Sequence, residues 1–87
     1  HITVHNPERY KDYVVADTPI FEKFGARFLV RGGESEVAEG TFKERHVVIE
    51  FDSFEQAKAC YESAEYQEVA KIRREASEGD ILLVAGT

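Results

Sequence analysis

The chain of 87 residues contains a single cysteine, two prolines, no methionine and no tryptophan. Cys60 alone cannot form an intrachain disulfide or a zinc site built from several thiolates, and such cysteine usage is typical of the cytoplasm. No apolar run approaches the roughly 18 residues that a membrane span needs, so we expect no membrane partner. With 11 Lys and Arg against 17 Asp and Glu, the net charge of −6 also argues against a nucleic-acid partner.

The chain nevertheless has the composition of a folded domain, with 43% hydrophobic and 11% aromatic residues. We find no repeat and no linker, so residues 1–87 are predicted to form one domain. A core of this size is close to the minimum for independent stability, which favours self-association. Residues 1–5 alternate between polar and apolar, which predicts a half-buried strand, and we expect this strand to begin before His1.

A first helix is predicted from Pro7 to Phe24. Asn6 can cap its free amide groups, and a proline at the first helical position loses no hydrogen bond. At 100° per residue, one face of this helix carries a continuous apolar stripe. The stripe consists of Tyr10, Tyr13, Val14, Ile20, Phe21 and Phe24.

Both predicted helices are expected to bend. Pro19 interrupts the first, so a kink or a restart capped by Asp17 or Thr18 is expected. Ser53 begins the second helix with a capping box, and Ser63 provides a second cap that bends or restarts it.

Three further strands are predicted, at residues 26–31, 46–51 and 81–85, with a shorter extended piece at residues 36–39. The order β-α-β-β-α-β is that of a ferredoxin-like α+β fold, in which one four-stranded antiparallel sheet carries two helices on one face. The apolar run at residues 81–85 indicates a strand buried on both sides. Because no residues remain to cover the second face of the sheet, we expect a homodimer formed through that face.

Several motifs, in the same order along essentially the whole chain, resemble the domain of unknown function 1330 (DUF1330) family. They are Asn6-Pro7-Glu8-Arg9-Tyr10, the run from Phe24 to Gly33, Ile49-Glu50-Phe51 with Ser53-Phe54, Tyr61 to Tyr66, Arg73 and Asp80-Ile81. The resemblance implies a dimeric α+β barrel, the superfamily that also contains antibiotic-biosynthesis monooxygenases and muconolactone isomerases. The family has no established activity, so the resemblance implies a fold and no reaction.

Arg73 is the most suggestive candidate for a site residue. It shares a helix face with Tyr66 and Ala70, where packing would prefer an aliphatic side chain. A guanidinium there can hold a substrate carboxylate or enolate through paired hydrogen bonds. The alternatives are an internal ion pair with Asp17, Glu50 or another acid, and a side chain that reaches the surface.

Asp17 and His46 are the candidates for proton transfer. Asp17 falls within the apolar stripe, so it is either a general base of raised pKa or, as we prefer, a cap for a helix that restarts near Pro19. His46 and Glu50 share one face of the third predicted strand and could approach His1. These three side chains are a ligand set for non-haem iron, but their spacing is not specific, so we expect no metal.

The tyrosines Tyr10, Tyr13 and Tyr66 either line a pocket for a flat ligand or form plain core. Cys60 lies off the predicted core-facing arc and has no base partner, so it is not expected to be a nucleophile. Possible entrance cations are Arg27, Arg31 and Arg45.

These observations predict a homodimer that binds a small anionic or aromatic molecule between sheet and helices without a cofactor. The predicted ligand-binding residues are Arg73, Tyr10, Tyr13, Tyr66 and Glu50. One alternative is a cofactor-independent enzyme for oxygenation, isomerisation or lactone chemistry, in which Asp17 or His46 moves the proton. Another is a structural or regulatory partner domain without a ligand site.

Overall fold

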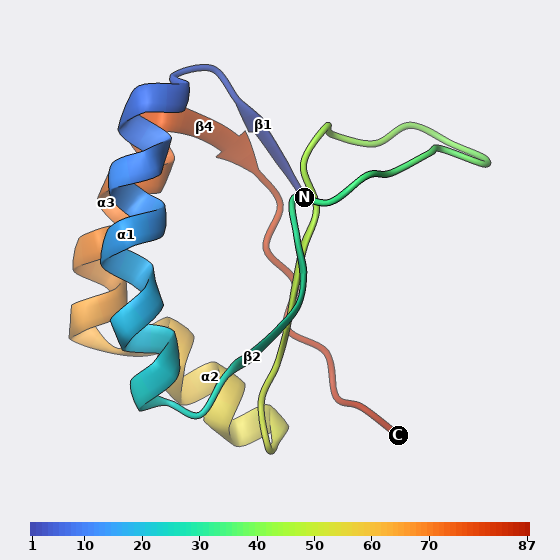
Figure 1. The fold of residues 1–87 in the computed structure, drawn as a ribbon. Helices are drawn as coiled ribbons and strands as arrows, with labels where there is room; N and C mark the ends of the chain where they lie inside the picture. Colours follow the sequence, from blue (N-terminus) through green and yellow to red (C-terminus); the bar gives the residue numbers. More distant parts are fainter.

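The computed structural model describes all of residues 1–87 as an α+β fold of three helices and four short strands (Figure 1). The predicted succession of strand, helix, two strands and helix is found, with the second helix divided in two, but the last strand lies at Ser77–Gly79 and not at the predicted residues 81–85. No helix is both long enough and apolar enough to span a membrane. The elements are β1 (Ile2–Val4), α1 (Pro7–Lys23), β2 (Arg27–Arg31), β3 (Val47–Glu50), α2 (Phe54–Glu62), α3 (Ala64–Ala76) and β4 (Ser77–Gly79).

The strands form two antiparallel pairs where one sheet of four strands was predicted. In the first pair, Ile2 of β1 lies opposite Gly79 of β4, and in the second, Arg27 of β2 lies opposite Glu50 of β3. One bridge connects the two pairs. The Ile2 amide donates to the Arg45 carbonyl at 2.7 Å, and the Arg45 amide donates to the Ile2 carbonyl at 2.8 Å. The two pairs therefore meet at a single seam beside Arg45.

Helix α1 begins as predicted, with Asn6 Oδ1 accepting a hydrogen bond from the Arg9 amide at 3.1 Å. It then continues through Pro19 as one α-helix. The expected restart is absent, so neither Asp17 nor Thr18 is a cap, and our preferred interpretation of Asp17 was wrong. Because a proline removes only one backbone hydrogen bond, tertiary packing along the whole stripe can maintain the helix across it.

Ser63 separates α2 from α3 and caps both. Its hydroxyl donates to the Cys60 carbonyl at 2.7 Å and accepts from the Tyr66 amide at 3.2 Å. Ser53 begins α2 in the same way, accepting from the Gln56 amide at 3.1 Å. Both predicted caps are therefore confirmed, and Ser63 is where the chain changes direction.

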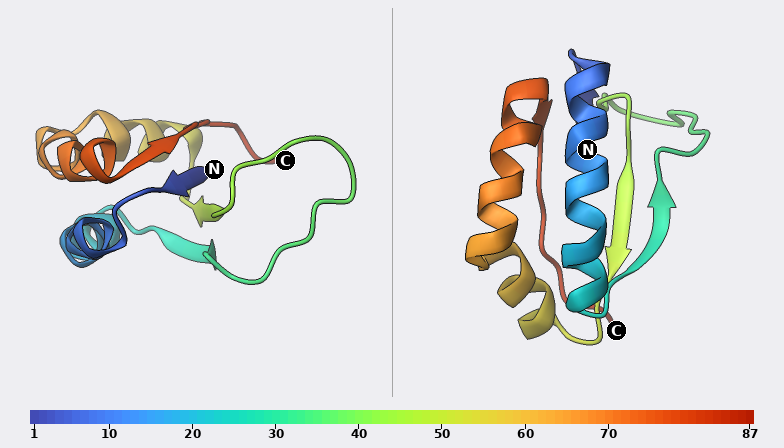
Figure 2. Two further views of the ribbon diagram at one scale, coloured as in Figure 1. Left: turned by 90° about the horizontal axis from the view of Figure 1, so that it is seen from above. Right: turned by 60° about the vertical axis from the view of Figure 1, so that its left-hand side comes forward.

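The core lies between α1, α3 and the strands, and α1 and α3 run side by side (Figure 2). The apolar stripe of α1 faces it, as predicted. Cys60 is only 1% exposed, so the expectation that it lies off the core was wrong. Ala70 and Ala76 are fully buried, and such small side chains allow close packing. The buried hydrophobic residues are Ile2, Tyr10, Tyr13, Phe21, Cys60, Tyr66, Ala70 and Ala76.

Two predicted extended segments do not form strands. Residues 36–39 lie in the irregular connection between β2 and β3, and residues 81–85 follow β4 without pairing. Leu82 is 78% exposed. In the register of β1 and β4, the Asp80 amide donates to the His1 carbonyl at 2.9 Å.

The double cap at Ser63 predicts a measurable contribution to stability. Ser63→Ala should lower the free energy of unfolding by about 1–2 kcal/mol, because the first turn of α3 loses an acceptor for its free amide. Urea unfolding followed by circular dichroism measures this difference. Ser35→Ala, at an exposed loop position, is the control and should leave stability unchanged. Equal stability of the two variants would contradict the role of the cap.

Candidate functional site

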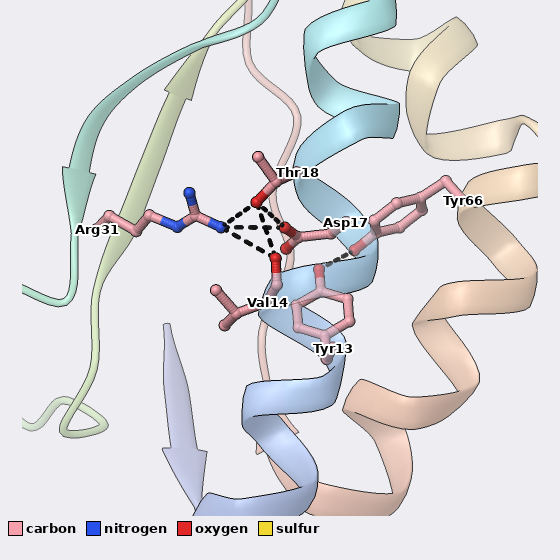
Figure 3. A network of polar contacts seen from close by, with 6 residues as sticks. All are labelled: Tyr13, Val14, Asp17, Thr18, Arg31 and Tyr66. Carbon is pink, nitrogen blue, oxygen red and sulfur yellow. Dashed lines mark hydrogen bonds and ion pairs between the residues drawn. The ribbon is translucent and has the colours of Figure 1, made fainter.

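An ion pair between a buried acid and a half-buried arginine connects α1 to β2. Asp17 is only 4% exposed in the middle of α1, and its Oδ1 lies 3.1 Å from Arg31 Nη2 (Figure 3). The same nitrogen lies 2.9 Å from Thr18 Oγ1 and 3.4 Å from the Val14 carbonyl. One guanidinium therefore contacts three oxygen atoms on consecutive turns of the helix.

A bulge in β2 aims Arg31 at the helix. The pairing with β3 shifts between Phe28 and Val30, which leaves Leu29 as an extra residue. In a regular strand, residues three apart point to opposite faces, and the extra residue brings Phe28 and Arg31 to the same face. The Arg31 guanidinium accordingly lies 4.0 Å from the centre of the Phe28 ring.

On the other side of Asp17, two tyrosines connect α1 to α3 (Figure 3). The hydroxyl groups of Tyr13 and Tyr66 are 2.7 Å apart and share a hydrogen bond. Burial, followed by the neighbouring Tyr66, raises the pKa of Tyr13 far above its ordinary value. Tyr13 therefore keeps its proton and can donate a hydrogen bond.

Arg73 is buried on α3 without an acidic partner. It is 6% exposed, it forms no ion pair, and its Nε is buried without a hydrogen-bond partner. The acids predicted as alternatives are engaged elsewhere: Asp17 with Arg31, and Glu50 with Arg27 at 2.9 Å on an exposed surface. The neighbouring Tyr66 and Tyr13 hydroxyl groups favour the charge of Arg73, but neither supplies a negative charge. An external anion would supply the missing acid.

Arg45 is a second cation without an acid. Its Nε is also buried without a partner, and its guanidinium lies 5.3 Å from the centre of the Tyr10 ring. Gly32 leaves room for the Arg45 side chain, because a Cβ atom at position 32 would collide with Arg45 Nη1. Burial raises the pKa of Tyr10, whereas the charges of Arg45 and Arg73 oppose that rise. Tyr10 therefore lies within the field of both arginines.

Asp17 has the properties of a group that exchanges protons near neutral pH. Burial raises its pKa from 3.8 to about 6, against the opposing effects of the Arg31 charge and of the Thr18 and Tyr13 hydroxyl groups. A carboxylate with such a pKa can accept a proton from a bound molecule and release it to solvent.

His46 lies apart from this cluster. Its Nδ1 is 2.9 Å from His1 Nδ1, so the expected approach of these two rings occurs. Glu50 is not brought to them. No group of three or more His, Cys, Asp or Glu side chains is arranged to hold a metal ion. The two rings border an open hollow of about 600 Å³, lined also by Ser35, Glu36, Val37, Ala38, Glu39 and Phe42.

The predicted site residues therefore divide between several places. Asp17, Arg73, Tyr10, Tyr13 and Tyr66 converge between the helices and the strands, whereas His46 and Glu50 lie outside. Arg31 and Arg45, predicted as entrance cations, contact the buried acid and Tyr10 directly. The sequence analysis did not identify Thr18 and Gly32 as parts of this cluster. Only Gly32 had a signal in the sequence, because a pair of adjacent glycines is typical of the positive φ that Gly32 adopts. Burial raises the pKa of the Cys60 thiol to about 11, which leaves it unreactive near neutral pH.

The raised pKa of Asp17 predicts how stability changes with pH. The folded protein holds this proton more tightly than the unfolded chain, so the contribution of Asp17 to stability is complete below about pH 4 and is lost as the pH rises through 6. The free energy of unfolding of the wild type, relative to that of Asp17→Asn, should fall by on the order of 3 kcal/mol between pH 4 and 7. Urea unfolding across this range measures it.

Carbon-13 NMR of the Asp17 carboxyl group provides the independent check. Its titration should have a midpoint near 6, and Arg31→Gln should move that midpoint upward, because the Arg31 charge favours the ionised form. A midpoint below 4 would show that Asp17 is not the proton-exchanging group.

Comparison of the sequence with family profiles identifies the family of the chain. The profile of the family described as "Domain of unknown function (DUF1330)" matches residues 1–87, which is the whole chain. No curated protein matches the sequence. The resemblance inferred from the motifs is thus confirmed, and the chain belongs to the DUF1330 family.

Proposed function

We propose that this protein binds a small anionic or aromatic organic molecule between its helices and its strands. The observation that carries the proposal is Arg73, a guanidinium that is 6% exposed and has no acidic partner. An unpaired buried charge destabilises a fold unless a ligand compensates it. The proposed ligand supplies the missing negative charge.

The surroundings of Arg73 suit such a ligand. Arg45 adds a second guanidinium without an acidic partner, and the buried Tyr10, Tyr13 and Tyr66 lie beside the two arginines. An arginine can bind a carboxylate through two parallel hydrogen bonds, and aromatic walls favour a flat molecule. These contacts combine strong anion binding with selection for shape.

We further infer that the two strand pairs belong to one ferredoxin-like sheet of order β4-β1-β3-β2, which assembles into a dimeric α+β barrel. The bridge between Ile2 and Arg45 supports this order, because it joins β1 to the residues just before β3. A second copy would cover the exposed apolar side chains of the strands and the final segment. These side chains are Leu29, Val30, Val48, Ile81, Leu82 and Val84.

A cofactor-independent enzyme is the second candidate, and one observation favours it. Asp17 is a buried carboxylate with a pKa of about 6, next to the tyrosine pair and within reach of the same ligand region. Such a group can remove a proton from a bound carbon acid or hydroxyl group, while an arginine stabilises the resulting anion.

The dimer makes a prediction about the outer face of β2 and β3. Val48→Glu should convert the dimer into a monomer, because it places a charge in the apolar surface that the second copy would bury. Analytical ultracentrifugation at micromolar concentration measures the mass, and circular dichroism verifies folding. Val15→Glu is the control, since Val15 is 75% exposed on α1, and this variant should remain dimeric. A monomeric wild type would contradict the dimer.

Ligand binding is tested first on the protein as purified. Native mass spectrometry should detect a small organic molecule that leaves on denaturation. Arg73→Gln should reduce the affinity for the recovered molecule at least tenfold, because a buried charge-assisted hydrogen bond is lost. Arg74→Gln is the matched control: Arg74 is the next residue of α3, is exposed, and contacts only Gln67.

Each outcome separates the candidates. Equal affinities of the Arg73 and Arg74 variants would contradict the binding site. Consumption of the molecule by the wild type but not by Asp17→Asn, with binding retained, would identify the enzyme. A protein that carries no molecule and binds none in a screen of organic acids would favour the partner domain.

A further inference from the structure

We propose that His1 and His46 bind one divalent transition-metal ion, nickel(II) or copper(II), across the seam between the two strand pairs. The Nδ1 atoms of the two rings are 2.9 Å apart. This site lies apart from the cluster of arginines and tyrosines and does not depend on the proposed binding of an organic molecule. It follows from the strand register, from the separation of the two nitrogen atoms and from the hollow that both rings border.

The register of the seam brings the two rings together. Ile2 and Arg45 pair in antiparallel order, and both backbone hydrogen bonds of that pair are present. The residue before Ile2 therefore lies opposite the residue after Arg45, and these two residues are His1 and His46. Figure 1 shows the N-terminus beside the segment that leads into β3. Positions next to a doubly hydrogen-bonded pair have their Cα atoms only about 4.5 Å apart, so the backbone itself sets the close approach of the rings.

Further backbone hydrogen bonds hold both histidines from their outer sides. The His1 carbonyl accepts from the amide of Asp80, the residue after β4, at 2.9 Å. The His46 carbonyl accepts from the amide of Gly32, the residue after β2, also at 2.9 Å. Ligands that the fold holds in place before the ion arrives lose less conformational freedom on binding.

The separation of the two nitrogen atoms favours an ion of planar or octahedral geometry. Bonds from a metal to imidazole are about 2.0–2.1 Å long, so two nitrogen atoms 2.9 Å apart would subtend about 90° at a shared ion. Neighbouring ligands of square-planar and octahedral ions make this angle, whereas two ligands of a tetrahedral ion at that bond length lie about 3.3–3.4 Å apart. Nickel(II) and copper(II) accept imidazole and prefer such tetragonal geometry.

The ion and the hydrogen bond between the rings use the same two nitrogen atoms. Without an ion, one ring donates its Nδ1 proton to Nδ1 of the other. An ion bound to both Nδ1 atoms requires both rings to carry their proton on Nε2. The donating ring therefore changes its tautomer, and two neutral imidazoles release no net proton.

The hollow of about 600 Å³ beside the rings is suited to a cation. Glu36 and Glu39 line it, and no lysine or arginine does. Lys43, which follows Phe42 of its lining, is engaged by Asp80 at 2.6 Å. The local negative charge attracts a divalent ion. No third protein ligand is arranged around the two rings, so the remaining positions of the ion are filled by water in the open hollow.

Isothermal titration calorimetry of the metal-free wild-type protein with NiCl₂ at pH 7.5 tests the site, and MgCl₂ is the comparison. We expect one Ni²⁺ per chain, bound at least tenfold more tightly than Mg²⁺, because imidazole nitrogen suits nickel whereas Mg²⁺ prefers oxygen ligands. The electron paramagnetic resonance spectrum of the Cu²⁺ complex should show splitting by nitrogen nuclei of both rings. Neither measurement requires a variant to fold.

Variants then assign the ligands. His46→Ala should weaken Ni²⁺ binding at least tenfold, because the second imidazole binds intramolecularly once the first has bound. It should also remove one nitrogen nucleus from the copper spectrum. His5→Ala is the matched control: His5 is the third histidine of the chain, is exposed, and should leave the affinity unchanged.

Thermal unfolding provides a second readout, because the ion would join the two strand pairs. At a Ni²⁺ concentration about 100 times its Kd, the Tm of the wild type and of His5→Ala should rise by at least about 5 °C. The Tm of His46→Ala should rise by less than half as much at the same concentration.

Ni²⁺ binding that His46→Ala leaves unchanged would overturn the proposal, since the ion would then bind other groups, such as the His1 ring with its own amino group. Equal affinities for Ni²⁺ and Mg²⁺ would overturn it in favour of the carboxylates of the hollow. No binding at millimolar Ni²⁺, or a copper spectrum without nitrogen splitting, would show that the two rings form a hydrogen bond and no metal site.

Discussion

The ion pair between Asp17 and Arg31 is the contact through which the helical layer and the β2–β3 pair depend on each other. A carboxylate in the middle of a buried helix face is expensive to ionise, and one guanidinium from the strand offsets much of that cost. The guanidinium reaches the helix only because the extra residue Leu29 reverses the direction of the side chains that follow it. Strand pairing and helix packing are therefore coupled at this point.

The same ion pair leaves Arg45 and Arg73 without an acidic partner. Because Asp17 is engaged by Arg31, it is not available to Arg45 or Arg73, and no other acid pairs with them. The tyrosines cannot replace it, since burial keeps Tyr13 protonated. The cluster is thus positively charged in an interior that cannot neutralise itself. In a chain whose net charge is −6, this local excess is specific to the site.

Sequence periodicity predicted the parts of the fold that depend on local spacing. The buried stripe of α1 and the caps at Ser53 and Ser63 follow from one helical period and from short-range hydrogen bonds. Asp17 lies within that stripe, but Pro19 two residues later favoured a cap. Whether the helix continues or restarts depends on whether packing along its whole length outweighs one missing hydrogen bond. That packing is a property of the tertiary structure and not of the local sequence.

The site was harder to predict because it depends on register. Nothing in the segment Arg27–Arg31 marks a bulge, so alternation alone would have placed Phe28 and Arg31 on opposite faces. Alternation related His46 to Glu50 by face alone and carries no distance between them. Four residues along a strand separate them by about 13 Å, and Glu50 pairs with Arg27 instead.

The apolar run at residues 81–85 shows how strand formation and assembly are related. Its composition is that of a buried strand, but these residues form no strand, and Ile81, Leu82 and Val84 are exposed. The exposed run lies in a molecule whose strands also expose Val30 and Val48, and association would bury this apolar surface. The seam between the strand pairs is the bridge at Arg45, which is also one of the two cations without an acid. The proposed assembly and the proposed anion binding would therefore both involve Arg45.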